Sequence, residues 1–254
     1  MEGIAIVNGM VVPLEEAGIS VLDPGFTQGW AVFEALTAIN GIPHNMGAHL
    51  DRLEGSCTEA CVAMPRRSVL ERELSLASSH VNGMSRLRIT LTAAEVRVVT
   101  ARPIDATRRH RPITAARGVY REDPYVQGSV KHCSRLSWMV AVARSAAEEV
   151  LLVDGKGRFT EGTTTGIIAV VNGEMWTHPQ DGRILESTTV QRMAERARAF
   201  GITVHWTAPD AAGPWDGLYV ASITRDIAPV TLLDDERLSG WEPIGRRLAG
   251  LPVR

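Results

Sequence analysis

The sequence of 254 residues predicts an α+β protein built from two domains. Short apolar runs joined by hairpin turns recur along the chain, helical periodicity is confined to a few segments, and the two patterns do not alternate regularly, which argues against a doubly wound parallel sheet. A basic stretch with two prolines and no apolar period interrupts the chain at residues 102–112. We therefore expect a small N-terminal domain over residues 1–106, a linker at 107–112 and a larger C-terminal domain over 113–254.

The elements of the first domain follow from turn signals and periodicity. Asn-Gly pairs at Asn8-Gly9 and Asn40-Gly41 are typical of tight hairpins, and each lies beside apolar, β-capable runs. Residues 49–63, which follow the second of these turns, repeat their apolar residues at helical spacing. The expected strands are 4–7, 10–12, 31–39, 87–92 and 96–101, and the expected helix is 49–63.

The second domain is predicted by the same signals. Hairpin turns are expected at Asp154-Gly155 and Asn172-Gly173, each between apolar runs. Two longer segments carry helical periodicity. The expected strands are 113–119, 150–153, 158–160, 166–171, 174–177, 217–222 and 230–233, and the expected helices are 134–149 and 189–200.

Composition indicates an enzyme or binding protein for small molecules. A net charge of −2 gives no reason to expect nucleic acid or an anionic membrane as a partner, and no aromatic residue interleaves the basic cluster near residue 110. No apolar run approaches the ~20 residues that span a bilayer, and no secretory signal pattern opens the chain, so the cytoplasm is the expected location. Cys57 and Cys61 have helical spacing; we expect two buried thiols and no metal site, because no second ligand pair accompanies them.

Lysine is scarce in this chain. Only Lys131 and Lys156 are lysines among 27 basic side chains, the rest being arginine. An arginine stays protonated, whereas a lysine can lose its proton and attack a carbonyl carbon. Lys156 lies in an Asp-Gly-Lys-Gly turn, which is typical of a solvated hairpin, but Lys131 precedes an apolar helical run that needs no surface charge. Lys131 is therefore the candidate nucleophile. The alternative is that the chain simply favours arginine over lysine and that its two lysines have no special role.

Several short motifs occur in a specific order. They are Asp23-Pro24-Gly25-Phe26, Val32-Phe33-Glu34, Asn40-Gly41, His49-Leu50-Asp51-Arg52-Leu53, Lys131, Thr160-Glu161-Gly162-Thr163, Asp181-Gly182-Arg183-Ile184-Leu185 and Ala228-Pro229-Val230. In order and spacing the chain resembles the class IV aminotransferases, the fold-type IV pyridoxal-phosphate enzymes that include branched-chain and D-amino-acid aminotransferases and 4-amino-4-deoxychorismate lyase. The resemblance covers residues 8–248. It implies a homodimer, and a C-terminal domain with a pseudo-barrel sheet.

The resemblance implies a cofactor, pyridoxal 5'-phosphate, and roles for three residues. Lys131 matches the lysine that forms the Schiff base with the cofactor and then moves the proton at the substrate carbon. Glu161 matches the carboxylate that keeps the pyridine nitrogen protonated, which makes the ring an electron sink. Arg52 matches the arginine that binds the cofactor phosphate, a task suited to a planar guanidinium. The plain structural alternatives are a turn residue for Glu161 and a surface charge for Arg52.

The rest of the expected phosphate site departs from the family pattern. Thr188 and Thr189 open the helix expected near residue 189, where amides and hydroxyls converge on an anion, but the usual Pro-Gly and arginine of this loop are absent. Ser222-Ile223-Thr224 places Ile223 where the family often has a phosphate-binding threonine. The flanking hydroxyls of Ser222 and Thr224 are expected to compensate.

The family resemblance says less about the residues of the substrate pocket. Trp30 and Phe33 match positions that line the substrate pocket, with a plain core role as the alternative for Phe33. Thr37 stands where many aminotransferases of the family have an arginine. These residues do not tell which amine is used, nor its stereochemistry.

Two reactions on one cofactor remain open from the sequence. Transamination moves an amino group between an amino acid or related amine and a keto acid. The lyase reaction expels pyruvate from aminodeoxychorismate to leave 4-aminobenzoate, and the Lys131-His132-x-x-Arg135-Leu136 segment and Ile223 are similar to some lyases. Transamination is the preferred interpretation, because chains of this family are mostly transaminases. A non-catalytic binding protein on the same fold is expected to lack Lys131 or Glu161, and both are present.

Overall fold

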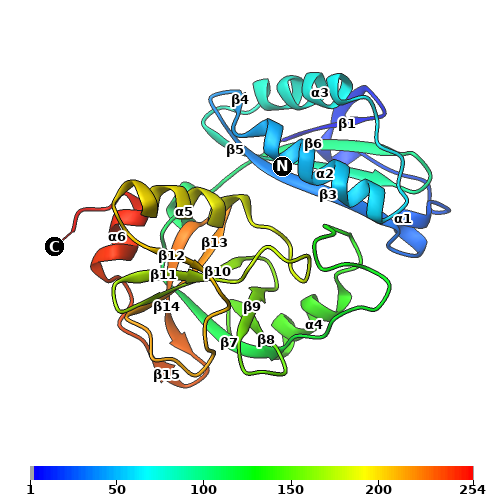
Figure 1. The fold of residues 1–254 in the computed structure, drawn as a ribbon. Coiled ribbons are helices and arrows are strands. Elements are labelled where there is room, and N and C mark those ends of the chain that lie inside the picture. The colour runs from blue at the N-terminus through cyan, green and yellow to red at the C-terminus, as the bar shows by residue number, and fades with distance from the viewer. Residues whose placement is uncertain (1–2, 254) are drawn as a thin grey trace. The chain divides into compact units, whose positions relative to one another are not determined.

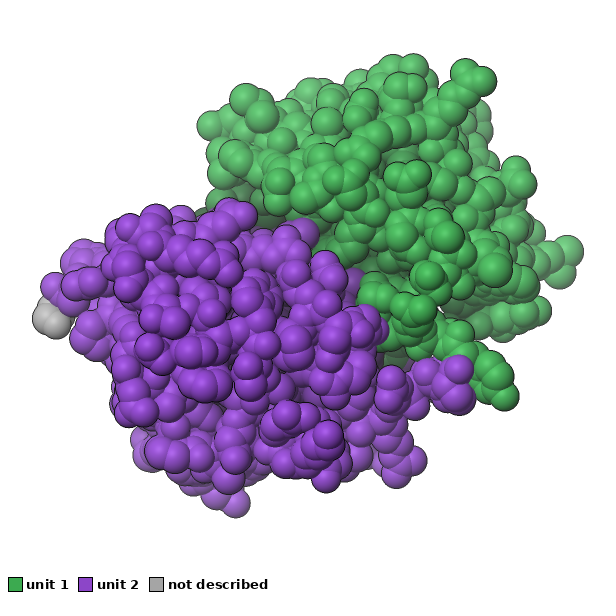
Figure 2. Space-filling model, viewed as in Figure 1, with its two compact units in different colours: residues 1–106, 125–135 green, residues 107–124, 136–254 purple. Residues whose placement is uncertain are grey.

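The computed structural model describes residues 3–253, and the chain divides into two compact units. The first unit contains the chain up to residue 106 together with residues 125–135; the second contains residues 107–124 and everything from 136 onward (Figure 2). Residues 125–135 lie within the C-terminal domain that the sequence predicts. They group with the first unit because their backbone pairs with a strand of its sheet, in an antiparallel bridge between Val32 and His132.

The first unit is a six-stranded antiparallel sheet with two helices packed on one face (Figure 1). The strand order is β2-β1-β6-β5-β3-β4. Its elements are β1 Ile4–Val7, β2 Met10–Pro13, η1 Leu14–Glu16, α1 Pro24–Thr27, β3 Ala31–Ile39, β4 Ile42–Pro43, α2 Met46–Glu59, α3 Arg67–Ser79, β5 Met84–Thr92 and β6 Arg97–Pro103. Helix α3 was not expected from the sequence, because its buried stripe is interrupted by the charged Glu73. Glu73 is accommodated by an ion pair with Arg97 at 2.7 Å.

The two faces of this sheet differ in character. Leu36 of β3 and Leu87 and Ile89 of β5 are fully buried in the core that α2 and α3 complete. Because side chains alternate along a strand, the intervening residues point to the other face. That face carries Phe33 from β3 and Arg88 from β5, and it is the face that holds most of the candidate residues of this unit.

The second unit is a nine-stranded mixed sheet whose far end curls back on itself (Figure 1). The order is β12-β11-β10-β13-β14-β7-β8-β9, with β15 beside β14. A turn in which Gly162 donates to the Thr165 carbonyl brings the last strand next to β10, as expected for a pseudo-barrel. The elements are η2 Ala106–Arg108, β7 Ile113–Val119, α4 Leu136–Arg144, β8 Glu149–Val153, β9 Phe159–Gly162, β10 Gly166–Val171, β11 Glu174–Thr177, α5 Thr188–Ala199, β12 Val204–Trp206, β13 Gly217–Ser222, β14 Asp226–Leu233, β15 Glu236–Arg237 and α6 Pro243–Ala249.

The stretch expected to be a linker is fastened to the second unit. Arg109 contacts the Asp226 carboxylate at 2.9 Å, and the His110 amide donates to the Arg225 carbonyl at 3.0 Å. Arg111 pairs with Glu148. Two basic residues of this stretch therefore pair with carboxylates of the second unit, Arg109 with the buried Asp226 and Arg111 with the exposed Glu148.

The expectation of two buried thiols on one helix is half wrong. Cys57 is buried in the first core, but Cys61 is exposed, because α2 ends at Glu59 and Cys61 takes a left-handed backbone with φ 53°. Among residues 3–253 no group of three or more His, Cys, Asp or Glu side chains is placed to hold a metal ion. None of the helices in this range is long and apolar enough to cross a membrane.

Candidate active site

Lys131 is held by backbone contacts on both sides. Its carbonyl accepts from the Phe33 amide at 2.8 Å, and its own amide donates to the Ser56 hydroxyl at 3.1 Å. Two residues on, the Cys133 amide donates to the Ala31 carbonyl at 2.8 Å. The segment thus runs as an added strand beside the start of β3, which fixes the position of Lys131 although it lies far from β3 in sequence.

Three cations surround the ring of Phe33. The Arg88 Cζ lies 3.7 Å from the ring centroid, Lys131 Nζ 5.0 Å and Arg135 Cζ 5.8 Å. An aromatic face attracts cations through its quadrupole. Phe33 is buried, but it is not part of the core beneath α2 and α3. The ring therefore lies on the face of the sheet that α2 and α3 do not cover, beside the candidate nucleophile.

On the opposite face of β3, Glu34 and Arg52 form a buried ion pair. The guanidinium binds the carboxylate through Nε to Oε2 and Nη2 to Oε1, both at 2.7 Å, and His49 lies 3.2 Å from Oε1. Burial raises the pKa of Glu34, but the charge of Arg52 and the hydrogen bonds from His49 and Arg52 outweigh it and lower the pKa to about 2. This carboxylate stays ionised, so it fixes the orientation of the Arg52 guanidinium.

The remaining candidates of the first unit lie near the same strand. Trp30 is half exposed and its indole Nε1 donates to the Ala60 carbonyl at 2.8 Å. Thr37 is half-buried and lies directly across from Arg86 in the register of β3 and β5. The first unit therefore carries Trp30, Phe33, Thr37, Arg52 and Lys131, and the last two reach it from α2 and from the 125–135 segment.

In the second unit, Glu161 lies on β9 and is 6% exposed. Tyr120 lies near enough that Glu161 contributes, after burial, to raising the pKa of the tyrosine to about 12. The Tyr120 hydroxyl donates to the Arg183 carbonyl. Sequence reasoning singled out Glu161 but not Tyr120, which follows a strand end and carries no motif.

The two segments expected to bind phosphate are joined through Asp226. Helix α5 begins at Thr188 and is capped by the Ser187 hydroxyl, which accepts from the Val190 amide at 3.2 Å. The other segment is a turn in which the hydroxyls of Ser222 and Thr224 lie 3.4 Å apart. Thr189 is buried, whereas Thr188, Ser222, Ile223 and Thr224 are half-buried.

Asp226 closes that turn and binds α5. Its backbone is left-handed, with φ 61°, and its carboxylate is 3% exposed. It accepts from Arg192 of α5 and from Arg109. This buried carboxylate was not foreseen, because the sequence gives no signal that two distant arginines converge on it.

Comparison with known proteins decides the family. The family model described as amino-transferase class IV matches residues 31–233. The chain belongs to this family. It is an enzyme of fold type IV, and its cofactor is pyridoxal 5'-phosphate.

The relatives of this class IV enzyme are named for two kinds of substrate, D-alanine and branched-chain amino acids. It is 25% identical to a D-alanine aminotransferase of Listeria monocytogenes, over 90% of this chain and 87% of the relative. It is 26% identical to a putative branched-chain-amino-acid aminotransferase of Methanocaldococcus jannaschii, over 89% and 86%. Its fold matches the pyridoxal-phosphate-bound form of a hypothetical aminotransferase from Mycobacterium tuberculosis with a TM-score of 0.89, at 23% identity over 98% and 96% of the two chains.

Proposed function

We propose that this enzyme moves an amino group between an amino acid or related amine and a keto acid, with Lys131 as the residue that binds the cofactor covalently. The placement of Lys131 carries the proposal. Its backbone is held by Phe33 and Ser56, and its amine faces the Phe33 ring on the open side of the sheet. A lysine whose main chain is fixed in this way presents its amine at a constant position, as a nucleophile requires.

The donor set of the chain fits pyridoxal phosphate. The aldehyde needs an amine, the ring nitrogen needs a carboxylate, and the phosphate needs cations and hydroxyls; the candidates are Lys131, Glu161 and Arg52 with the hydroxyl-bearing segments of the second unit. Gly166 supports the fit, since a Cβ there would overlap Val190 and crowd Ser187 at the start of α5. The close approach of β10 to the first turn of α5 keeps that helix end in place for an anion.

When bound, the cofactor supplies an electron sink that stabilises negative charge at the substrate carbon. The chain's own residues do the rest. Lys131 takes the proton from the substrate carbon and returns it at the cofactor carbon. Glu161 holds the proton on the ring nitrogen. The candidates for the phosphate are Arg52, which Glu34 orients, and, in the second unit, Thr188, Thr189, Ser222, Thr224 and the backbone at Ile223. Trp30, Phe33 and Thr37 are the candidates for the substrate side.

A lyase reaction is the second candidate, in which pyruvate leaves 4-amino-4-deoxychorismate and 4-aminobenzoate remains. The observation that favours it is Arg135. This residue lies in the Lys131-His132-x-x-Arg135-Leu136 segment that is similar to some lyases, and its guanidinium faces the same Phe33 ring as Lys131. Both reactions use the same lysine and the same cofactor.

The test uses the scarcity of lysine. The purified protein and its Lys131→Ala and Lys156→Ala variants are mixed with pyridoxal phosphate, reduced with borohydride and digested, and the labelled peptide is identified by mass spectrometry. We expect label at Lys131 in the wild type and in Lys156→Ala, and none in Lys131→Ala, because only these two lysines are present. Label at Lys156, or none in the wild type, would refute the assignment.

The reaction is then assigned with unlabelled, cofactor-loaded enzyme. L- and D-amino acids are supplied with pyruvate or 2-oxoglutarate, and aminodeoxychorismate is supplied alone. Conversion of the cofactor to its aminated form by an amino acid supports transamination. Formation of 4-aminobenzoate without any amino acid turnover supports the lyase.

The proposal extends to assembly and location. The family resemblance supports a homodimer, which the mass in solution from light scattering tests directly. The cytoplasm remains a prediction from the sequence, and localisation of the tagged full-length chain tests it.

A further inference from the structure

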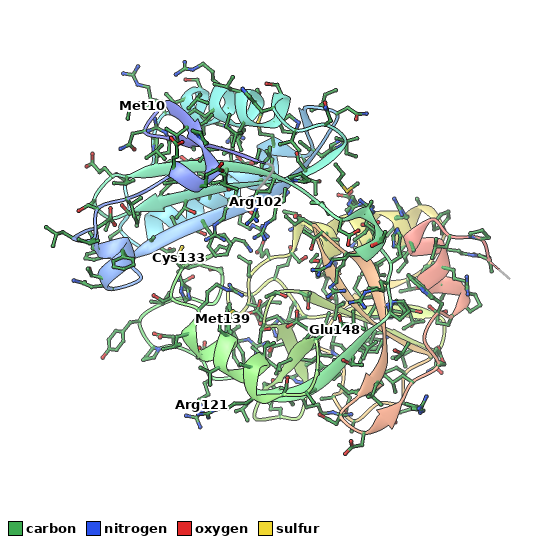
Figure 3. The ribbon with its side chains drawn as sticks, turned by 180° about the vertical axis from the view of Figure 1, so that it is seen from behind. Met10, Arg102, Arg121, Cys133, Met139 and Glu148 are labelled. Carbon is green, nitrogen blue, oxygen red and sulfur yellow. The ribbon has the colours of Figure 1, made fainter. Side chains whose placement is uncertain are left out.

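A buried carboxylate to which the proposed reaction assigns no role lies at the start of β8. Glu149 is 3% exposed, and the residue before it, the exposed Glu148, is labelled in Figure 3. The rest of the strand, Val150–Val153, is apolar, and all but its last residue are buried. Burial of a carboxylate is unfavourable unless its oxygens receive hydrogen bonds. The partners of Glu149 therefore show what this residue holds in place.

Both oxygens of Glu149 are bound by the turn that follows β9. Oε1 accepts from the Thr163 hydroxyl and, at 3.1 Å, from the Val150 amide, and Oε2 accepts from the Thr164 hydroxyl at 2.5 Å. Two successive threonines thus bind the two oxygens of one carboxylate. The turn cannot rotate without breaking one of these hydrogen bonds, so Glu149 fixes its conformation.

The backbone of this turn is packed against Glu149 as well. The Thr163 amide donates to the Val150 carbonyl at 3.0 Å, and the Gly162 amide donates to the Thr165 carbonyl at 2.8 Å. A Cβ on Gly162 would lie 3.3 Å from the carboxyl carbon of Glu149 and 2.2 Å from Thr165 Oγ1. The glycine therefore allows the main chain to approach the carboxylate closely.

An irregular stretch of β9 includes Glu161. Gly162 pairs with Leu151, but the register of β8 and β9 shifts before the next pair along the strands. Such a shift leaves the intervening residues outside the regular ladder. Glu161 belongs to this stretch and is 6% exposed. Its backbone therefore depends on the contacts at the ends of the stretch, and Glu149 supplies those at the turn.

We propose that Glu149 is a positioning residue that holds the Glu161 carboxylate at the pyridine nitrogen of the cofactor. This rests on the proposed function, in which Glu161 keeps that nitrogen protonated. Glu149 acts through the turn, by way of the hydroxyls of Thr163 and Thr164. Displacement of a functional group by about 1 Å can lower a rate about a hundredfold. The lysine and the phosphate ligands proposed above lie on other segments, so Glu149 controls the rate and not the attachment of the cofactor.

The test measures the protonation of the ring nitrogen in Glu149→Gln. Wild type and variant are loaded with pyridoxal phosphate that is isotopically labelled at this nitrogen, and its NMR chemical shift is followed from neutral to alkaline pH. We expect the nitrogen to stay protonated in the wild type and to lose its proton in the variant as the pH rises, because the carboxylate that stabilises the pyridinium is displaced. The kcat should fall about tenfold or more, with the KM nearly unchanged.

Glu73→Gln is the matched control, because it removes a carboxylate of equal burial from another part of the chain. Glu73 is 4% exposed and pairs with Arg97 in the first unit. Its replacement should lower the unfolding temperature and leave the titration of the ring nitrogen as in the wild type. The proposal is overturned by a Glu149→Gln variant whose ring nitrogen titrates like that of the wild type or of Glu73→Gln.

Thr164 gives a second test that leaves the buried carboxylate in place, since its own side chain is exposed. Thr164→Val removes the hydroxyl that binds Oε2 and keeps the side-chain shape, whereas Thr164→Ser keeps the hydroxyl. We expect Thr164→Val to shift the titration in the same direction as Glu149→Gln, and Thr164→Ser to shift it less. Equal behaviour of the two Thr164 variants counts against the proposal, even where Glu149→Gln does not fold. Failure of the proposed function is distinct, because the wild type would then carry no cofactor on Lys131.

Discussion

Glu34 and Arg52 form a two-point ion pair in which the carboxylate is fully buried and the guanidinium side chain is 14% exposed. The pair connects the central strand β3 to helix α2. Breaking such a pair by removing one charge leaves the other charge buried without compensation. The strength of this contact therefore affects the stability of the first unit and the orientation of Arg52, the proposed phosphate ligand.

Replacing Glu34 by Gln should destabilise the protein by about 3–5 kcal/mol, since Arg52 would lose its counter-charge. Below about pH 4.5 the gap in unfolding free energy between wild type and variant should shrink. The pKa of Glu34 in the folded protein is lowered to about 2 from 4.5, so its contribution, roughly 3 kcal/mol, is present above about pH 4.5 and is lost as the pH falls toward 2. Urea unfolding from pH 7 to pH 3 measures both effects.

Glu54→Gln is the control for this experiment, because Glu54 is an exposed carboxylate on the same helix. It should change the unfolding free energy by less than about 0.5 kcal/mol. A Glu34→Gln variant as stable as Glu54→Gln, or a gap that widens in acid, would contradict the assigned pairing.

Asp226→Asn should weaken cofactor binding by about tenfold or more, because Asp226 holds the Ser222–Thr224 turn and α5 together through Arg192. Asparagine tolerates the left-handed backbone, so the substitution tests the charge and not the turn conformation. Titration of the apoprotein with pyridoxal phosphate, followed by tryptophan fluorescence, gives the dissociation constant. Asp234→Asn is the control, because Asp234 also has a left-handed backbone but is exposed. An equal loss of cofactor affinity in both variants would exclude a positioning role for Asp226.

Gly245→Ala in α6 should destabilise the protein by about 1–3 kcal/mol, because the added methyl group would overlap the Tyr219 ring. Tyr219 is fully buried and its hydroxyl contacts the Gly240 carbonyl at 3.2 Å, so the ring has no free direction in which to move. Gly55→Ala in α2 meets nothing within 4 Å and should stabilise by up to about 1 kcal/mol. Thermal unfolding of the two variants should shift in opposite directions, and a destabilised Gly55→Ala variant would count against the packing described for α2.

Local pattern predicted much of this fold. The strands at 113–119, 166–171, 174–177 and 217–222 coincide with β7, β10, β11 and β13, because β-capable runs and the Asn172-Gly173 turn are encoded by neighbouring residues. Helix α4 ends at Arg144, short of the expected 149, where the Ser145 hydroxyl bonds back to the Val142 carbonyl. Such a bond gives the backbone an alternative to continuing the helix.

The pairings that the sequence did not predict are formed between residues far apart in the chain. The pairing of Glu34 with Arg52, the convergence of Arg109 and Arg192 on Asp226, and the face shared by Arg86 and Lys131 all depend on register and on helix packing. A single sequence gives the residue types for these contacts but not which partners meet. The charged residues on β5 were visible as an alternation with leucine and isoleucine, and that alternation is the signal that could have placed Arg86 and Arg88 on one face.

The grouping of residues 125–135 with the first unit has a consequence for biosynthesis. A ribosome that has translated residues 1–106 has synthesised all named strands of the first sheet, but not the segment that pairs with β3 and bears Lys131. That segment emerges only after residues 107–124, which belong to the second unit. The first unit therefore cannot be completed before synthesis of the second has begun, and Lys131, the proposed nucleophile, joins the first sheet only at that stage.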